Sequence, residues 1–324
     1  MKIAVLLVDN INSKSVISKY EPKLTPKYYF NLYYKKFTLL DEFFLTKSNS
    51  IELLKKIIPK YDVFLNLCDG AKDDDRPGIE VVDFLERNKI PYTGANPSFY
   101  EPSREEMKEA AIKSNVLTPK HMFVYDLAEL KYFNLNFPVV VKHYCSYSSI
   151  GMTEKSLVYE YKSLLEEVSR FVNTFGGALI EEYIKGTECS ALVVSVDNNT
   201  TFVFDPIEVI LPKNEKIKHF NLKWKYFDQI KYRKIADSCL REKIEYSAKK
   251  IYENIGGNGY ARFDFIINEK KELFFLELNP NCSVFYDPKD PSTADVILSM
   301  HNKGYEIFIE NILNFANFRV KVQK

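Results

Sequence analysis

Polar and apolar residues alternate with the period of a β-strand from residue 259 to 285, GYARFDFIINEKKELFFLELNPNCSVF. Two apolar-rich segments separated by the charged turn NEKKE predict a β-hairpin. Because residues two apart share a strand face, Arg262 lies beside Asp264, and Glu277 beside Asn279. Two carboxylates and an amide oxygen on one face are ligands that Mg²⁺ prefers, although a solvated polar face is the other interpretation.

The remaining hydrophobic pattern predicts an α/β protein in which short apolar strands alternate with amphipathic helices. Helix ends are marked by acidic residues in a first turn and by glycines after a last turn. Strands are expected at 3–8, 63–67, 122–125, 137–142, 191–196 and 201–210, and helices at 51–58, 78–88, 102–114, 158–172 and 237–254.

These elements group into three domains. We expect an open α/β layer at 1–97, a central lobe at 98–177 and a third lobe at 178–324, whose sheet carries helices on one side. Residues 9–36 contain two prolines and four tyrosines without a clear period. They form either a substrate-facing loop or a surface connection, and clustered aromatic residues are more often packing residues.

A second polar site is expected where two central strands end. The strand at 137–142 delivers Lys142 into the loop HYCSYSSIGM, whose N–H groups and hydroxyls are suited to wrapping a phosphate chain beside the ammonium group. Downstream, ALIEEYIKGTE presents Glu181, Glu182 and Glu188 at a strand end and turn. Carboxylates and free backbone groups in such places hydrogen-bond an adenine edge and ribose hydroxyls.

The chain resembles the ATP-grasp carboxylate–amine ligases, and among them the D-alanine–D-alanine ligase-like branch. The resemblance covers nearly the whole chain and rests on motifs in a fixed order: VFLNLCDG, IPYTGANP, VVVK with a later GM, LIEEYIKGTE, ARFDF and LELNPN. It implies an ATP-grasp fold of three lobes, with an N-terminal open α/β domain and the nucleotide between the central and C-terminal lobes. ATP and Mg²⁺, with Mn²⁺ as a substitute, are the implied cofactors.

The resemblance also implies a role for individual residues, position by position. Lys142 contacts the nucleotide phosphates, and Ser148 and Ser149 lie in the small loop that closes over the γ-phosphate, so that Ser149 joins Lys142 and Arg262 as a catalytic residue. Arg262 faces the reacting carboxylate. The other implied contacts are Glu181, Glu182 and Ile184 for adenine, Glu188 for ribose, and Asp264, Glu277 and Asn279 for the metal.

The chain departs from this family at several positions. Arg104 stands where an ATP-binding lysine is expected, and Lys108, one turn later, competes for that role, because a planar guanidinium and an ammonium group are not interchangeable. Tyr147 replaces a glycine of the small loop. Residues 8–13 and 280–286 differ from the segments that hold the two amino acids in D-alanyl ligases. The nucleotide machinery is therefore expected to transfer, whereas the D-alanine specificity is not.

Two charged segments have both a functional and a structural interpretation. The lysine-rich and aromatic segment 213–234 lies between strands, where a lid would sit, and Lys223, or failing that Lys225, would reach the γ-phosphate. A solvated basic loop is the alternative. The run Asp73, Asp74, Asp75 and Arg76 follows a strand end, where open sheets bind ligands, so it either holds an amino group or is simply solvated.

Composition restricts the protein to ordinary globular classes. The 324 residues are 46% hydrophobic and 27% charged, with a formal net charge of +1, which gives no electrostatic case for a nucleic-acid or membrane partner. Five scattered cysteines without a C-x-x-C pair argue for a reducing compartment. The first eight residues are too short and too quickly followed by polar residues for a signal peptide, so the cytoplasm is expected. A homodimer is possible by analogy with related ligases.

The expected function is ATP-dependent joining of an amino acid or small carboxylic acid to an amine through an acyl phosphate, giving a peptide-like amide. Transfer of the γ-phosphoryl group activates the carboxylate, and the amine then attacks the acyl carbon. Two alternatives stay open at this stage: a ligase that acts on a peptide or protein carboxylate, and an ATP-binding protein without turnover.

Overall fold

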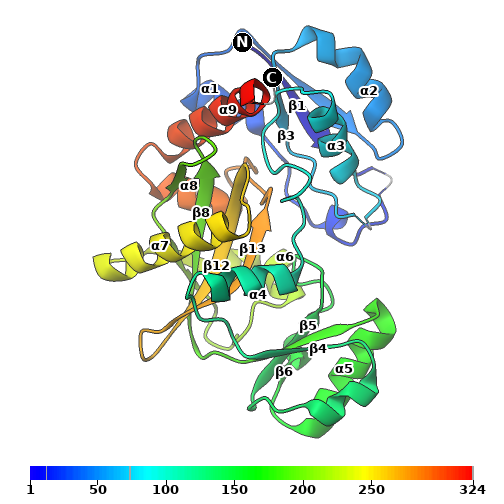
Figure 1. Ribbon diagram of the computed structural model, residues 1–324, viewed down its shortest axis with the longest axis vertical. Coiled ribbons are helices and arrows are strands. Elements are labelled where there is room, and N and C mark those ends of the chain that lie inside the picture. The colour runs from blue at the N-terminus through cyan, green and yellow to red at the C-terminus, as the bar shows by residue number, and fades with distance from the viewer. Residues whose placement is uncertain (12, 73, 323–324) are drawn as a thin grey trace.

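The computed structural model describes residues 1–11, 13–72 and 74–322, and these residues form three β-sheets with helices packed on them (Figure 1). Each sheet belongs to one stretch of the chain, except that the C-terminal helices return to the first sheet. The predicted α/β class is confirmed, and so are the predicted helices and strands, except that the single strand expected at 201–210 is two strands, at 201–203 and 207–210.

The first sheet is parallel, in the order β2-β1-β3. One face packs on α2 and α3 and the other on α1 and α9, so both faces are covered, as parallel sheets require. The elements are β1 (Lys2–Val8), α1 (Pro26–Tyr33), β2 (Leu39–Leu45), α2 (Ser50–Ile57), β3 (Val63–Asn66), α3 (Ile79–Arg87) and α9 (Gly304–Val322).

Helix α1 and strand β2 were not predicted from the hydrophobic pattern. Pro26 occupies the first turn of α1, a position that needs no N–H donor, so this proline begins the helix instead of preventing it. The helix turns Tyr29 and Phe30 into the core against Phe285, whereas Tyr28 and Tyr33 stay exposed. Part of the tyrosine cluster is thus packing, as its composition suggested.

The central sheet is antiparallel, in the order β4-β7-β5-β6, and α5 covers one face. Helix α5 begins three residues later than predicted, because residues 157–158 pair with β5 as a strand. It ends as expected at Gly176, which takes a left-handed φ of 82°. The elements are β4 (His121–Val124), β5 (Val139–His143), β6 (Leu157–Val158), α5 (Tyr161–Phe175) and β7 (Ala178–Glu182).

The third sheet is antiparallel, in the order β11-β10-β8-β12-β13, with β9 paired to β8. The expectation of helices on one side was wrong: α4 and α7 cover one face, and α8 and α9 the other. Strand β8 is apolar on both faces and therefore needs both layers. The elements are α4 (Arg104–Lys113), β8 (Gly186–Ser195), β9 (Thr201–Val203), β10 (Ile207–Ile210), α6 (Phe220–Trp224), β11 (Lys231–Lys234), α7 (Ser238–Asn254), β12 (Tyr260–Asn268), β13 (Leu273–Pro280) and α8 (Thr293–Met300).

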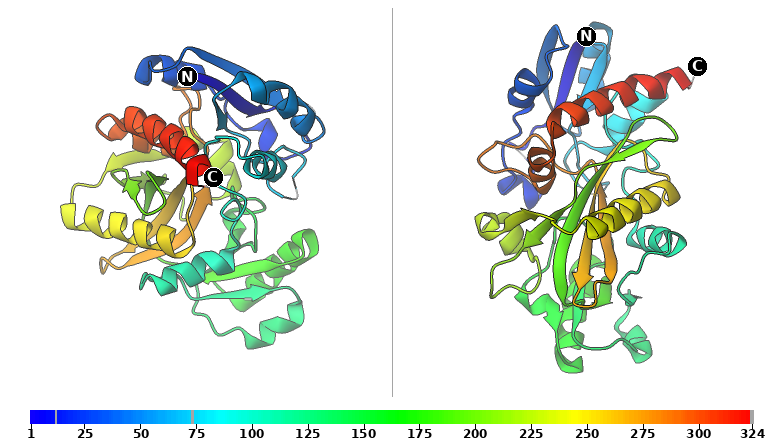
Figure 2. Two further views of the ribbon diagram at one scale, coloured as in Figure 1. Left: turned by 45° about the horizontal axis from the view of Figure 1, so that its top comes forward. Right: turned by 90° about the vertical axis from the view of Figure 1, so that its left-hand side faces the viewer.

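Helix α9 packs against sheets from both the N-terminal and the C-terminal parts of the chain. In the side view of Figure 2 it lies between the N-terminal sheet and the third sheet, and its apolar residues belong to one core that contains side chains from β1, β3 and β8. The first and third domains thus share a hydrophobic core. Within the described residues, none of the helices is long and apolar enough to cross a membrane.

Candidate active site

The predicted hairpin is formed by β12 and β13, with Asp264 opposite Glu277 and Arg262 opposite Asn279. Directly opposite residues of an antiparallel pair share a face, so all four side chains project from the same side. Arg262 donates from Nε and from an NH2 nitrogen to the two oxygens of Asp264, at 3.0 and 2.9 Å. Asn279 Nδ2 donates to Asp264 Oδ2 at 3.1 Å. The four polar side chains that strand alternation places on one face therefore form one cluster.

Both carboxylates of this cluster are held in the ionised state. Burial alone would raise the pKa of Asp264, but the Arg262 guanidinium outweighs it and the pKa lies below its usual value. The pKa of Glu277 is also lowered against the effect of burial, chiefly by Arg104, which contacts Glu277 Oε2 at 2.8 Å. The hairpin thus presents two charged carboxylates, each balanced by one arginine.

Glu181 joins the two lysines that the sequence proposed as phosphate contacts. Its two carboxylate oxygens form ion pairs with Lys108 and Lys142, and all three residues are buried. Burial by itself raises the pKa of Glu181, yet the two ammonium groups outweigh it and the pKa falls below its usual range. Lys108 comes from α4 and Lys142 from β5, so the carboxylate holds these two elements together.

The remaining nucleotide-binding candidates are spread over two sheets. Glu182 faces away from Lys108 and Lys142, and its carboxylate accepts from the backbone N–H and the side-chain amide of Asn136, both at 2.9 Å. Ile184 lies half-buried in the connection between β7 and β8. Glu188 lies on β8 opposite Ile266, and burial raises its pKa. The structure therefore does not bring the Glu182 side chain together with the other predicted nucleotide-binding residues.

In the small loop after β5, two serines adopt a backbone conformation that glycine usually adopts. Ser148 and Ser149 have φ values of 63° and 56°, in the left-handed region that glycine favours. Ser149 Oγ donates to the Lys218 carbonyl at 2.8 Å, and Trp224 Nε1 donates to the Ser148 carbonyl at 3.1 Å. These bonds join the loop to the segment 213–234. Tyr147, where a glycine was expected, is anchored instead by its hydroxyl, which donates to the Pro102 carbonyl at 3.0 Å.

The segment 213–234 contains helix α6, which carries Lys223 to the site. Burial, together with the positive charges of Arg262 and Lys218, lowers the pKa of Lys223 to about 7. Lys225 is exposed and lies 5.6 Å from the ring centroid of Tyr20. Of the two lysines proposed for the lid, Lys223 is the one whose surroundings favour contact with an anion.

A cavity of about 1120 Å³ lies between the small loop, helix α6, the hairpin and the N-terminal domain. Ser148, Lys223, Arg262 and Asn279 line it directly, and they come from separate parts of the chain. Lys142, Glu181, Glu188, Asp264 and Glu277 are not among its lining residues.

An ionic cluster on the N-terminal side of this cavity was only partly predicted. Arg76 contacts Glu21 at 3.3 Å, Asp69 at 3.4 Å and Asp74 at 2.8 Å. Burial, and then the charge of Asp69, raise the pKa of Glu21 to about 7, and Tyr286 donates its hydroxyl to Glu21 at 2.8 Å. Sequence reasoning missed Glu21 because residues 9–36 show no period that marks it.

The aspartate run of the sequence has two kinds of partner in the structure. Asp74 belongs to the Arg76 cluster, whereas Asp75 accepts bonds from the Ser13 hydroxyl and the Lys14 N–H, both at 2.7 Å. Asp75 therefore fixes the loop after β1, and Asp73 lies outside the described residues.

The three-lobed fold, the carboxylate hairpin and the lysine-bearing strand define an ATP-grasp ligase. The family model described as "D-ala D-ala ligase C-terminus" matches residues 116–284. The chain belongs to this family, and it is an ATP-grasp ligase related to the D-alanine–D-alanine ligases. The predicted family and the predicted ATP-grasp fold are therefore confirmed.

Individual relatives agree with the family assignment. A D-alanine–D-alanine ligase of Flavobacterium psychrophilum is 30% identical over 236 residues, 69% of this chain and 67% of that protein. A ligase of the same name from Francisella tularensis subsp. novicida is 25% identical over 249 residues, 75% of this chain and 77% of that protein.

Solved structures show the same fold over almost the whole chain. The VanG D-Ala:D-Ser ligase of Enterococcus faecalis aligns with a TM-score of 0.72 at 16% identity, covering 97% of this chain and 99% of that chain. The D-alanine–D-alanine ligase of Bacillus anthracis complexed with ATP aligns with a TM-score of 0.66 at 19% identity, covering 100% of both chains.

Proposed function

We propose that this ligase uses ATP to activate a carboxylate as an acyl phosphate and then joins it to an amine, with substrates other than the D-alanine pair. The observation that carries the proposal is the hairpin face, where Asp264 and Glu277 lie beside Arg262 and Asn279, two residues that line the large cavity together with Lys223. A binding protein without turnover has little use for such a set. Support for ATP comes from the family and from the ATP complex of the Bacillus anthracis relative.

The nucleotide would lie between the central and third sheets. Lys142 and Lys108 would meet the phosphate oxygens, and the ion pairs of both ammonium groups with Glu181 support this role. Arg104 is engaged with Glu277 and with the Ser146 carbonyl, at 2.8 Å each, so Lys108 is the better candidate for the second phosphate cation. Ser148, Ser149 and Lys223 would then close over the γ-phosphate.

The donor set of the hairpin fits Mg²⁺, because Asp264 and Glu277 are ionised, adjacent across the strands and next to the Asn279 amide. Mg²⁺ held there would neutralise charge on the phosphoryl oxygens. The residues of the chain do the rest: Arg262 binds the reacting carboxylate and stabilises the oxyanion that forms when the amine attacks.

A changed substrate is supported by the wall of the cavity. The cluster of Glu21, Asp69 and Asp74 around Arg76 contributes three carboxylates against one guanidinium, which suits an amino group. Its Glu21 accepts from the hydroxyl of Tyr286, which belongs to the segment 280–286 that departs from the D-alanyl ligases. A reducing compartment such as the cytoplasm belongs to the same proposal, and none of the five cysteines, all of which lie within the described residues, forms a disulfide.

The test is ADP release with Mg·ATP across pooled D- and L-amino acids and small carboxylic acids. Glu277→Gln should lower the rate by about 10²-fold or more, because a metal carboxylate is lost. Glu269→Gln on the exposed hairpin turn is the matched control and should keep the rate. ADP release in no pool, or equal rates in the two variants, would contradict the proposal; efficient synthesis of D-alanyl-D-alanine would contradict the changed substrate.

A further inference from the structure

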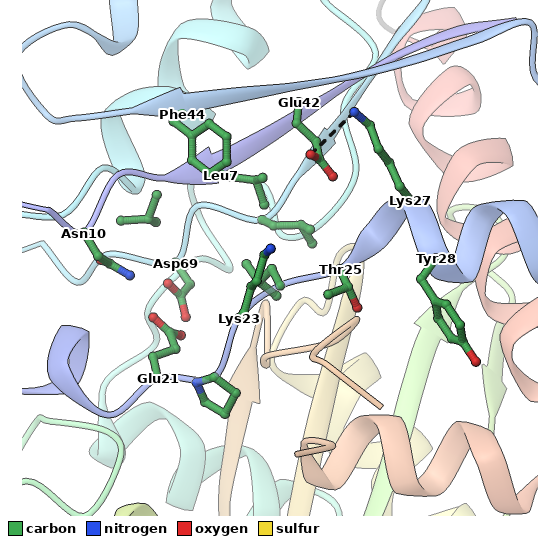
Figure 3. A pocket seen from close by; sticks show the side chains of 14 residues that line it. Leu7, Asn10, Glu21, Lys23, Thr25, Lys27, Tyr28, Glu42, Phe44 and Asp69 are labelled. Carbon is green, nitrogen blue, oxygen red and sulfur yellow. Dashed lines mark ion pairs between the residues drawn. The ribbon is translucent and has the colours of Figure 1, made fainter. Parts of the chain in front are cut away.

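A second, smaller cavity of about 420 Å³ lies in the N-terminal domain, and none of the residues proposed above for the nucleotide lines it (Figure 3). It opens at the carboxyl ends of the parallel strands, where open α/β sheets bind ligands. Leu7 of β1, Phe44 of β2 and Leu67, directly after β3, line it, and the segment 21–28 forms the opposite wall.

The two cavities have a common wall. Glu21, Pro22 and Asp69 line both of them. Figure 3 shows the carboxylates of Glu21 and Asp69 turned toward each other at one side of the small cavity. A group bound at these carboxylates from the large cavity is therefore next to the small one.

Both apolar and charged side chains line the small cavity. Leu7, Leu24 and Leu67 supply aliphatic surface. Lys27 is paired with Glu42 at 3.5 Å, whereas the ammonium group of Lys23 has no ion-pair partner among the described residues. Figure 3 shows the Lys23 side chain extending toward Leu7.

The position of Lys23 is fixed by the backbone. Its carbonyl accepts from the Asp287 N–H at 2.8 Å, and the Thr25 N–H donates to the Phe285 carbonyl at 2.7 Å. The segment that carries Lys23 is therefore attached to the chain that follows the metal-binding strand β13. A ligand in the small cavity would contact an element tied to the reaction centre.

We propose that the small cavity binds the side chain of an amino-acid substrate larger than alanine, with an aliphatic stem and a carboxylate or amide at its end. The substrate ammonium group lies at Glu21 and Asp69, its reacting carboxylate lies toward Arg262, its stem packs on Leu7 and Leu67, and its terminal oxygen meets Lys23. This inference rests on the proposed ligase function and names the class of its first substrate. Apolar walls with a few placed polar groups are the usual composition of such sites.

The experiment compares alanine, norleucine, glutamate, 2-aminoadipate and lysine, each in both stereoisomers, as first substrates in ADP release and in mass analysis of the products. We expect kcat/KM for glutamate or 2-aminoadipate to exceed that for alanine by at least tenfold, and lysine to be the poorest of the long substrates. Lys23→Met should reduce the preference for 2-aminoadipate over norleucine by about tenfold, the range of one charge-assisted hydrogen bond.

A substitution that fills part of the small cavity tests whether the substrate side chain binds there. Leu67→Phe adds volume to the small cavity, and we expect it to lower the ratio of kcat/KM for 2-aminoadipate over alanine by tenfold or more. Phe43→Trp adds volume on the opposite face of the same sheet, where Phe43 packs beside Tyr61, and should leave this ratio unchanged. Because each readout is a ratio within one variant, partial loss of folded protein does not imitate the effect.

The outcomes separate the two proposals. ADP release with alanine-sized substrates alone, a preference for lysine, or a ratio that is insensitive to Leu67→Phe would overturn the side-chain site while the ligase function stands. If no acid led to ADP release, the proposed ligase function itself would be contradicted.

Discussion

Glu181 is the buried carboxylate on which two buried cations depend. Lys108 and Lys142 both form ion pairs with it, and their own charges make it more acidic than an ordinary glutamate. Removing one partner of a buried ion pair leaves uncompensated charge, which costs far more than breaking a pair at the surface. The stability of this group and its ability to bind a nucleotide are therefore linked.

We expect Glu181→Gln to lower the free energy of unfolding by about 3 to 5 kcal/mol at pH 7. The pKa of Glu181 is depressed in the folded state, so its stabilisation is fully present above the ordinary pKa of 4.5 and is lost as the pH falls below that value. Urea unfolding from pH 7 to pH 4 should show the difference between wild type and variant shrinking on acidification.

The exposed pair of Lys185 and Glu269, 2.7 Å apart, provides the control for this measurement. Glu269→Gln should cost less than about 1 kcal/mol and should show little pH dependence. A Glu181→Gln effect as small as this control, or one that grows on acidification, would mean that the two lysines do not need the carboxylate.

Single residues were predictable from the sequence where strand alternation fixes a face. Arg262, Asp264, Glu277 and Asn279 follow from two strands and one turn, and the structure groups them. Glu21 does not follow in this way, because its partners Asp69 and Arg76 are reached only through the tertiary fold. Lys108 was named only through the family resemblance, and its ion pair with Glu181 of the central sheet is likewise reached only through the tertiary fold.

At the scale of elements, helix α6 and the small loop after β5 act as a pair. Trp224 of α6 donates to the Ser148 carbonyl, Ser149 donates to the carbonyl of Lys218 just before α6, and the Phe220 N–H donates to the Met152 carbonyl at 3.2 Å. Both elements line the large cavity. These contacts predict that the segment 213–234 and the small loop would move together when a nucleotide binds.

Trp224 is the single tryptophan of the chain and so reports on this contact. We expect Mg·ATP to change the intrinsic fluorescence, and Ser149→Ala to raise the Kd for Mg·ATP by about 3- to 10-fold, the effect of one hydrogen bond. Ser169→Ala on α5, where the Ser169 hydroxyl accepts from Asn173 Nδ2 at 3.1 Å, is the matched control. An unchanged fluorescence on saturation with Mg·ATP, or equal Kd values in the two variants, would show that the lid does not respond to the nucleotide.

Elements were predictable where their own residues carry a regular period. Helix α7, with its N-cap at Asp237, and the hairpin strands were found within one or two residues. Helix α1 was missed because a tyrosine-rich segment that begins with a proline has little amphipathic pattern of its own. Its place is set by contacts with Phe285 and Tyr305, which are distant in sequence.

At the scale of the whole molecule, the first and third domains meet at a close backbone contact. Arg319 of α9 donates to the Gly94 carbonyl at 2.7 Å, and the Ala95 N–H donates to Asn281 Oδ1 at the same distance. Gly259, just before β12, lies against Gly94. The strand that carries Arg262 and Asp264 therefore begins at this contact, which aligns the hairpin with the N-terminal wall of the cavity.

Gly259→Ala tests this contact, because a Cβ at that position would lie 2.2 Å from the Gly94 carbonyl oxygen and the backbone φ is +93°. Gly256→Ala is the matched control: its φ is +73°, but a Cβ there meets nothing within 4 Å. The control isolates the conformational cost of a left-handed residue, about 1 kcal/mol. Gly259→Ala should lower the free energy of unfolding by at least about 2 kcal/mol more than the control, since backbone cannot move aside as a side chain does.

Urea unfolding measures the stability of both variants. The catalytic rate should fall only in Gly259→Ala, because the displaced strand β12 carries Arg262 and Asp264 away from Glu21 and Asp69. Equal effects of the two substitutions would mean that the domains tolerate separation at this point, and that the alignment of the hairpin with the cavity wall depends on α9 instead.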